Sequence, residues 1–266
     1  MGIYTKVVSI VKPIDDIKVS VGGSLKNIES AWIFVKGVRK QVFPTTEKWT
    51  LIYENTNPGI YEKELGWGKY KITFSGGGGA GGAAAYGSGG HAGQYANNGS
   101  AGEEKTFYYS VGENKTVTLS GIIGTGAAGS YAKGLGDQRV PLDICDAEAG
   151  AAGTGYDNGK QGSSRIYVSR DGAYDGYGAA GGSGGGSSSV SINGSLYSTA
   201  RGGNGGEASA RTSAFPAQGG GQGGSGGVSN GTGAAGGTGK TFYKDEGTSG
   251  AGANGYVRIY ISNMKP

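Results

Sequence analysis

The chain has 266 residues and a formal net charge of +4, from 24 Lys and Arg against 20 Asp and Glu, and 60 of its residues are glycine. Glycine is used about three times as often as in ordinary proteins, but it is clustered rather than placed at every third position, and there are only 6 Pro, which excludes collagen. The 17 Tyr, 6 Phe and 3 Trp argue against disorder throughout, and the scattered charges argue against nucleic-acid binding.

Residues 1–44 differ from the rest of the chain and predict a small β module. Alternating apolar residues predict strands at Ile3–Val11 and Ile17–Val21. A hairpin is expected from Ala31–Lys36 and Val38–Phe43, with its turn at Lys36-Gly37.

Residues 45–266 alternate between short strands and glycine-rich runs. We expect the final strand to pair with residues 70–75, and we expect hairpins from 107–111 with 116–119 and from 190–193 with 195–199. No segment has the apolar period of an amphipathic helix. The predicted strands are Trp49–Glu54, Tyr70–Ser75, Lys105–Val111, Thr116–Leu119, Arg165–Ser169, Val190–Asn193, Ser195–Thr199 and Tyr256–Ile261.

Two-glycine triplets recur at 78–83 (GGAGGA), 181–186 (GGSGGG), 202–207 (GGNGGE) and 220–228 (GGQGGSGGV). A period of three matches the polyproline-II-type helix, which has no internal hydrogen bonds. Without side chains, such helices can approach closely and bond to one another, which offsets the entropy that glycine loses on ordering. The predicted fold is therefore mainly β or irregular, with short strands supporting a packed bundle of polyglycine-II helices. A disordered glycine-rich chain is the alternative.

Long loops with large side chains separate the glycine runs. We expect them to collect at the two ends of the bundle, as a rigid scaffold that presents recognition loops. The loops are Ala83–Gly102, Ser130–Ala149, Thr154–Tyr177, Ala208–Gln218 and Lys240–Thr248. Tyrosine and arginine suit recognition because they bring large contact area at modest entropic cost. The candidate receptor-binding residues are Tyr86, Tyr95, Tyr131, Arg139, Tyr156, Arg170, Tyr174, Tyr177, Arg211 and Phe215. The alternative is that the tyrosines shield the glycine lattice.

Candidate catalytic and ligand motifs are weak. Ala234–Thr241 fits a permissive phosphate-loop pattern but lacks the preceding strand and following helix. His91 is the only histidine and Cys145 the only cysteine, so neither a disulfide nor a Cys–His metal cluster can form within the chain. Asp143 and Asp146 could hold Ca²⁺, although solvated carboxylates are the better interpretation. We expect no catalytic site, metal or cofactor.

The sequence also lacks a secretion signal and an apolar stretch near the ~20 residues that a membrane-spanning helix needs. We therefore expect no membrane insertion.

The glycine triplets, alternating with aromatic loops over about residues 76–240, resemble the glycine-rich adhesins at phage tail-fibre tips, especially those of T-even-like long tail fibres. GKYKITFSGGGGAGG and GANGYVRIYIS also resemble a broader glycine-rich domain of phage structural proteins, related to one in anaplastic-lymphoma-type receptor kinases. Residues 1–44 depart from the adhesins. Within them, WIFVKGVRKQVF is similar to short strands of phage tail and baseplate proteins.

The resemblance implies a non-enzymatic adhesin of the virion, in a tail fibre or tail tip. Residues 1–44 would attach to other phage tail proteins, and residues 45–266 would present loops to a bacterial surface protein or glycan. One alternative is a structural tail, baseplate or capsid-decoration protein without receptor contact. Another is an ice-binding polyglycine protein, although the Arg-, Lys- and Tyr-bearing loops argue against the flat uncharged face that such a protein needs.

Overall fold

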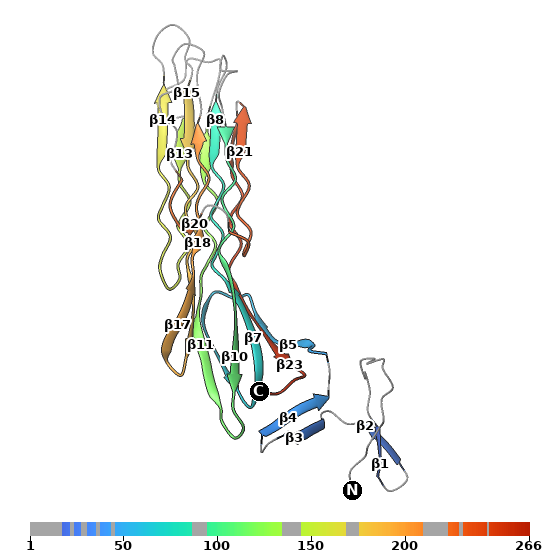
Figure 1. Ribbon diagram of the computed structural model, residues 1–266. Helices are drawn as coiled ribbons and strands as arrows, with labels where there is room; N and C mark the ends of the chain where they lie inside the picture. The colour runs from blue at the N-terminus through green and yellow to red at the C-terminus, as the bar shows by residue number, and fades with distance from the viewer. Residues whose placement is uncertain are drawn as a thin grey trace.

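The computed structural model describes residues 18–21, 24–27, 31–35, 38–43, 46–86, 95–134, 145–168, 176–209, 223–228, 231–243 and 245–266. Within these ranges the chain forms strands joined by extended segments and turns, and no residue lies in an α-helix. The protein is therefore mainly β, as its sequence predicts. The body is long and narrow, with two sheets at one end, glycine-rich segments in the middle and short strands at the other end (Figure 1).

Two four-stranded antiparallel sheets pack face to face and form what we call the sandwich end. One sheet has the order β10-β7-β23-β5 and the other β17-β16-β11-β6. The strands are β5 (Trp49–Asn55), β6 (Gly59–Leu65), β7 (Gly68–Ser75), β10 (Glu104–Val111), β11 (Val117–Ile123), β16 (Ser188–Ile192), β17 (Ser195–Ala200) and β23 (Tyr256–Ser262).

The core of the sandwich follows from alternation along its central strands. In β7, Tyr70, Ile72 and Phe74 are buried, while the residues between them are more exposed. They pack with Leu119 and Ile123 of β11 from the facing sheet. Each fully buried aliphatic side chain stabilises the fold by about 1.5–3 kcal/mol, so this cluster is the main apolar core of the described chain.

Two of the three predicted pairings of the sandwich are confirmed. The final strand lies against β7, with Val257 opposite Phe74. The hairpin of β16 and β17 turns at Asn193 (φ 49°) and Gly194 (φ 78°), which are the two left-handed positions that a type I′ turn requires.

The third predicted hairpin is wrong. β10 pairs with β7, whereas β11 pairs with β6 and β16 in the opposite sheet. The turn after Val111 therefore carries the chain across the sandwich. This crossing places both Val111 and Leu119 in the shared core, which a hairpin between the two strands would not require. The strand β6 was not predicted, because Glu62, Lys63 and Glu64 give it a polar sequence.

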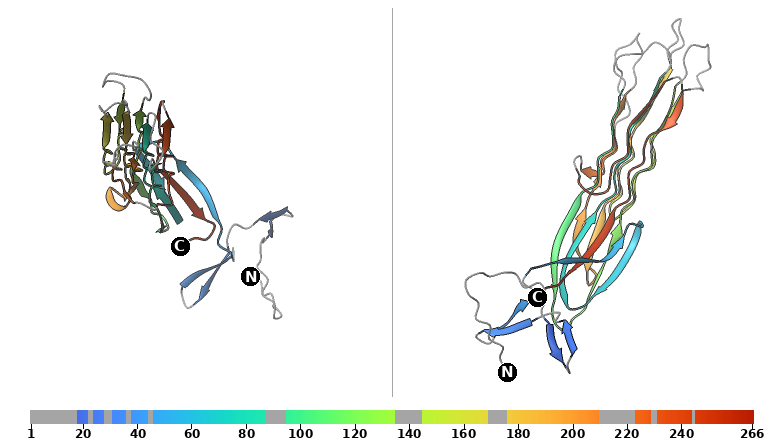
Figure 2. Two further views of the ribbon diagram at one scale, coloured as in Figure 1. Left: turned by 90° about the horizontal axis from the view of Figure 1, so that it is seen from above. Right: turned by 90° about the vertical axis from the view of Figure 1, so that its right-hand side faces the viewer.

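Beyond the sandwich, glycine-rich segments run side by side along the body (Figure 2). Residues 76–82 lie at the centre of this glycine bundle. Every backbone N–H from Gly76 to Gly82 donates to a carbonyl of another segment, over 2.8 to 3.1 Å, and the recipient changes with a period of three. Gly76, Gly79 and Gly82 donate to 97–103, Gly77 and Ala80 donate to 181–187, and Gly78 and Gly81 donate to 249–255.

Three other segments donate to the carbonyls of residues 76–82. These segments are 124–130, 201–207 and 231–240. Residues 76–82 are therefore bonded to six neighbours. These six neighbours form a ring, and segments that are adjacent in the ring also bond to each other. The backbone N–H groups that donate, each with the carbonyl that accepts, are Gly99 to Gly237, Ala253 to Ala235, Gly252 to Ala127, Gly186 to Thr125, Gly185 to Gly203 and Glu103 to Arg201. The bundle is cohesive in two dimensions, whereas a sheet bonds each strand to only two neighbours.

Close approach, rather than unusual backbone angles, explains the glycines of the bundle. A Cβ at Gly78 or Gly79 would lie well under 3.0 Å from the carbonyl oxygen of Ala235 or Asn204, respectively. Among the described glycines only Gly59, Gly194 and Gly227 have positive φ. Any side chain at Gly78 or Gly79 would therefore push a neighbouring segment away and break its hydrogen bonds.

At the far end of the bundle the segments become short strands with an alanine core. Ala84, Ala179 and Ala208 form one buried cluster, and Ala83, Ala85 and Ala132 form another. The strands are β8 (Ala83–Tyr86), β9 (Tyr95–Ala96), β12 (Tyr131–Lys133), β13 (Asp146–Glu148), β14 (Ser164–Val168), β15 (Gly176–Ala180), β19 (Ala208–Ser209), β21 (Lys240–Tyr243) and β22 (Glu246–Thr248). A further pair, β18 (Gly202–Gly203) and β20 (Gly227–Val228), lies within the bundle.

The first part of the chain contains two hairpins. β1 (Lys18–Val21) pairs with β2 (Ser24–Asn27), and β3 (Ala31–Val35) pairs with β4 (Val38–Phe43). The second hairpin is the one that the sequence predicts. Residues 3–11, also predicted as a strand, lie outside the described residues, and a separate module over residues 1–44 stays a prediction. The described part of the chain contains no helix with the length and apolarity that crossing a membrane requires.

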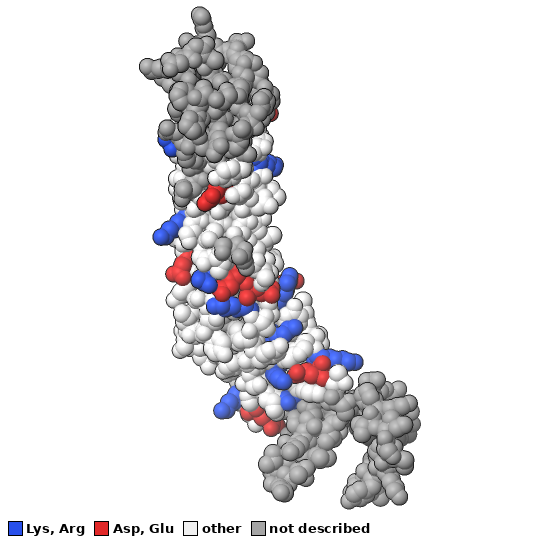
Figure 3. Space-filling model, turned by 45° about the horizontal axis from the view of Figure 1, so that its top comes forward, with Lys and Arg blue, Asp and Glu red and all other residues white. Residues whose placement is uncertain are grey.

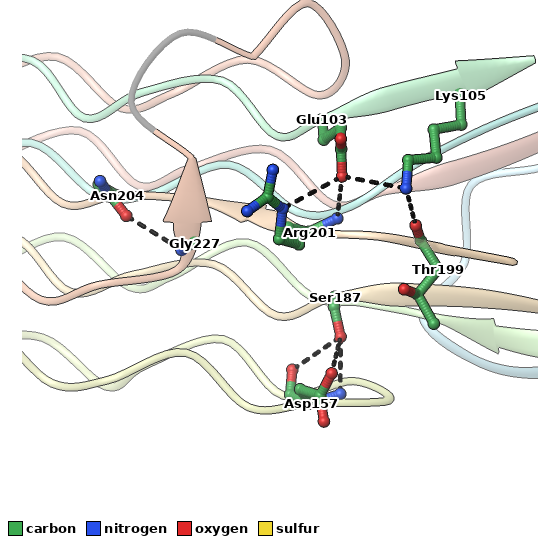
Figure 4. Close-up of polar contacts among 8 residues, drawn as sticks. All are labelled: Glu103, Lys105, Asp157, Ser187, Thr199, Arg201, Asn204 and Gly227. Carbon is green, nitrogen blue, oxygen red and sulfur yellow. Dashed lines mark hydrogen bonds and ion pairs between the residues drawn. The ribbon is translucent and has the colours of Figure 1, made fainter.

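A polar network joins the sandwich to the bundle (Figure 4). Glu103 Oε2 accepts a hydrogen bond from the backbone N–H of Arg201 over 3.0 Å, and it lies 3.5 Å from Arg201 Nε and 3.7 Å from Lys105 Nζ. Lys105 Nζ also donates to the carbonyl of Thr199 over 2.7 Å. Burial by itself would raise the pKa of Glu103, but the Arg201 N–H and the charges of Lys105 and Arg201 outweigh it and lower the pKa.

We predict that Gly79→Ala strongly destabilises the protein, whereas Gly66→Ala does not. The added methyl at position 79 meets backbone on a neighbouring segment, while a Cβ at position 66 has nothing within 4 Å. We expect Gly79→Ala to lower the free energy of unfolding by about 3 kcal/mol or more. Gly66→Ala should leave stability unchanged or raise it by up to about 1 kcal/mol. Thermal and urea unfolding measure the stability of both variants. Equal destabilisation by the two substitutions would contradict the interpretation that close approach of segments requires glycine at position 79.

We predict that Glu103→Gln lowers stability by about 1–2 kcal/mol at pH 7, because the Arg201 N–H and two cations lose their charged partner. The folded-state pKa of Glu103 is depressed, so its contribution is present above the ordinary value of 4.5 and is lost as pH falls through the folded pKa. Urea unfolding at pH 7 and pH 3 should show the difference between the two proteins shrinking in acid. The exposed Glu64→Gln is the control, and an equal pH effect there would contradict the assignment.

Candidate functional site

Strands that border the five predicted loops end together at one end of the body, which we call the loop-bearing end. For Ala208–Gln218 this holds for β19 alone, because the next strand, β20, lies within the bundle. The register between neighbouring strands shows this placement. Residue 86 lies opposite residues 177 and 243, and residue 168 lies opposite residue 176. Residue 133 lies opposite residues 146 and 246, and residue 95 lies opposite residue 209. The shared alanine clusters hold β8, β9, β12, β15 and β19 at the same level. The prediction that loops collect at both ends is met only in part: these strand ends lie at the loop-bearing end, whereas the start of the predicted loop Thr154–Tyr177 turns where the bundle meets the sandwich.

Two of the predicted loops include residues that belong to the glycine bundle. Residues 97–102 and 154–163 belong to the glycine bundle, where their backbone groups bond to neighbouring segments. For example, Ser100 N donates to Asn204 O over 2.7 Å, and Lys160 N donates to Ser225 O over 2.8 Å. These stretches contain asparagine, serine and lysine, which conceal their similarity to the purer glycine runs.

Tyr86 and Tyr177 occupy opposite positions on neighbouring strands. The row continues across the sheet β14-β15-β8-β21, because Tyr167 lies opposite Tyr177 and Tyr243 lies opposite Tyr86. Four strands thus carry tyrosine at one level of the loop-bearing end. Sequence reasoning included only two of them, although Tyr167 and Tyr243 lie within predicted loops. Their alignment depends on strand register between distant segments.

Tyr95 and Tyr131 also lie at this end, and their side chains are described. Tyr95 begins β9 and is 45% exposed. The hydroxyl of Tyr131 donates to Glu246 Oε2 over 2.8 Å, and the same carboxylate pairs with Lys133 Nζ at 2.8 Å. Partial burial, and then the Glu246 carboxylate, raise the pKa of Tyr131, while the bonds from Lys133 and Tyr131 lower the pKa of Glu246. This contact fixes the orientation of the Tyr131 ring.

Tyr156 lies elsewhere. Its backbone N–H donates to the carbonyl of Ser187 over 2.9 Å, immediately before β16 begins. It is 46% exposed, but it sits where the bundle meets the sandwich. The structure therefore separates Tyr156 from the other described candidates, and it cannot share a binding surface with Tyr95.

The remaining candidates, Arg139, Arg170, Tyr174, Arg211 and Phe215, lie outside the described residues. So do His91 and Asp143. Asp146 is exposed, and its Oδ1 accepts a hydrogen bond from the N–H of Ala147 over 2.8 Å. Cys145 is half-buried and forms no disulfide. Within the described ranges, no three His, Cys, Asp or Glu residues come together as a metal site.

Charge is unevenly distributed along the visible face (Figure 3). Acidic and basic side chains gather around the sandwich and its junction with the bundle, where Glu103, Lys105 and Arg201 form ion pairs. Much of the bundle beyond this band carries few charges. At the loop-bearing end, the described side chains include the aromatic candidates Tyr95 and Tyr131 and the ion pair of Lys133 with Glu246.

No protein-family model matches this chain, and a comparison with curated proteins finds no similar sequence.

Proposed function

We propose that this protein is a phage tail-fibre or tail-tip adhesin that recognises a bacterial surface protein or glycan. The observation that carries the proposal is that strands bordering all five predicted loops end at one end of a cross-bonded bundle. Rigid scaffolds with loops gathered at one end are suited to recognition. The protein would act as a component of the virion, without catalysis, metal or cofactor.

We also propose that the segments of the bundle are polyglycine-II helices. This helix has three residues per turn, so successive N–H groups point in three directions about its axis. The three recipients of residues 76–82, which alternate with a period of three, support this assignment. So does the ring of six mutually bonded neighbours, which is the arrangement expected of packed three-fold helices.

The two ends of the body support a direction for the adhesin. Residues 46–48, which follow the predicted attachment module, lie next to β5 and bond to Asn263 at the sandwich end. The loop-bordering strands lie at the opposite end, beyond the bundle. In this arrangement residues 1–44 join other tail proteins, and the loop-bearing end faces the bacterium.

Affinity would come from a few aromatic anchors on a stiff support. A scaffold whose backbone is bonded to neighbours on several sides loses little further freedom when a ligand binds. Tyrosine adds contact area with only two side-chain torsions to order, and Tyr131 is already held by Glu246. The row of tyrosine positions at 86, 167, 177 and 243 places further aromatic residues at the same end.

We predict that Tyr95→Ala weakens binding to host cells at least about fivefold, whereas Tyr156→Ala has no effect. The two side chains are a matched pair, because they are 45% and 46% exposed but lie at opposite ends of the bundle. The measurement is saturable binding of fluorescently labelled full-length protein to a panel of intact bacteria. Thermal unfolding of both variants checks that the fold is kept.

The cell-binding measurement distinguishes an adhesin from a structural virion component. Strain-specific binding that is weakened only by Tyr95→Ala supports the adhesin and its direction. Equal loss of cell binding in both variants contradicts the proposal that recognition takes place at the loop-bearing end alone. If the folded wild-type protein binds no strain, the alternative is a structural tail, baseplate or capsid-decoration component that contacts only other virion proteins.

A further inference from the structure

The chain enters the sandwich through an edge strand that is paired on one side only within the described sheets. β5 lies antiparallel to β23, with Trp49 opposite Ser262 at the outer limit of the sandwich end and Asn55 opposite Val257 near the bundle. Tension applied to residue 46 would pull β5 along its own axis, away from the bundle. β23 would be held from the other direction, because it continues into residues 249–255.

Asn263 extends this strand pair beyond its last regular position. Its backbone N–H donates to the carbonyl of Lys48 over 3.0 Å, and its side-chain Oδ1 accepts from the N–H of Lys48 over 2.7 Å. Its Nδ2 donates to the carbonyl of Thr46 over 3.1 Å. The side-chain amide thus replaces the peptide groups that a longer β23 would have supplied.

Neighbouring contacts tie this point to the rest of the sandwich. Ser262 Oγ donates to Glu47 Oε1 over 2.8 Å, and the same oxygen pairs with Lys69 of β7 at 2.8 Å. The bond from Lys69 lowers the pKa of Glu47. Lys265 lies over the ring of Trp67, with Nζ 4.8 Å from the ring centroid, and donates to the Trp67 carbonyl over 3.3 Å. Residues 46–48 are therefore connected to β7 as well as to β23.

We propose that residues 262–265 form a clasp that transmits tension from the N-terminal attachment into the sandwich as shear. This inference rests on the proposed function, in which residues 1–44 are held by the virion and the loop-bearing end is held by the cell. In shear, the hydrogen bonds between β5 and β23 are loaded together. Without the clasp, residues 46–48 would separate first, and the load would then be shared by the β5–β23 bonds alone.

The path beyond β23 spreads the same tension. Residues 249–255 bond to three segments of the bundle, 76–82, 124–130 and 231–239. Gly252 N donates to Ala127 O over 2.9 Å, and Ala253 N donates to Ala235 O over 2.8 Å. Force that enters at the clasp is therefore divided among several chains before it reaches the loop-bearing end.

Single-molecule force spectroscopy on the full chain tests the clasp. One handle is attached at the N-terminus, and the other to a thiol introduced by Tyr95→Cys in a Cys145→Ser background. Asn263→Ala is expected to raise the unfolding rate of the sandwich at a given force about tenfold, because forced unfolding is governed by the unfolding rate and the clasp bonds are lost.

The same variant pulled from a different point is the control. With the first handle moved from the N-terminus to Pro266, tension enters β23 directly and does not pass through β5. Asn263→Ala should then change the rate by less than about twofold. Equal acceleration in both geometries, or no acceleration from the N-terminus, would overturn the proposal. Neither measurement involves a receptor, so a failed clasp and a failed adhesin are told apart by the separate cell-binding experiment.

Discussion

The architecture depends on backbone hydrogen bonds between extended segments that approach too closely for side chains. Residues 76–82 donate in rotation to three neighbours and accept from three more. Such a ring needs glycine at most inward positions, because a Cβ at Gly78 or Gly79 would meet a neighbouring carbonyl. The entropy lost on ordering glycine is opposed by bonds on all sides rather than by an apolar core. The body can therefore be long and narrow and still be cohesive along its whole length.

The size of the buried side chains differs between the sandwich end, the glycine bundle and the loop-bearing end. Phe74, Ile72 and Leu119 fill the space between two sheets at the sandwich end, and alanines fill the narrower space at the loop-bearing end. Between them the glycine bundle leaves almost no space at all. Several segments pass through all three environments; for example, β7, residues 76–82 and β8 are one continuous run from the sandwich to the loop-bearing end. The glycine bundle thus fixes the spacing of the strands on both sides of it.

In the proposed adhesin, this continuity would separate attachment from recognition. The apolar core and the contacts of Asn263 lie at one end, while the strands that border the loops lie at the other. Changes in the loops need not disturb the sandwich, because the bundle between them is bonded through its backbone.

The sequence by itself determined the local periods. Alternation predicted β7 and β23, and the short aromatic character of both strands predicted their pairing. Asn193-Gly194 predicted its turn, and the glycine triplets predicted an ordered bundle. It did not predict that β10 and β11 lie in different sheets, that Tyr95 and Tyr156 lie at opposite ends, or that Tyr131 meets Glu246. Those outcomes depend on which distant segments pack together and in which direction each one runs. Only the tertiary structure decides this, because a repeat of three residues is the same in a segment that ascends the bundle and in one that descends it.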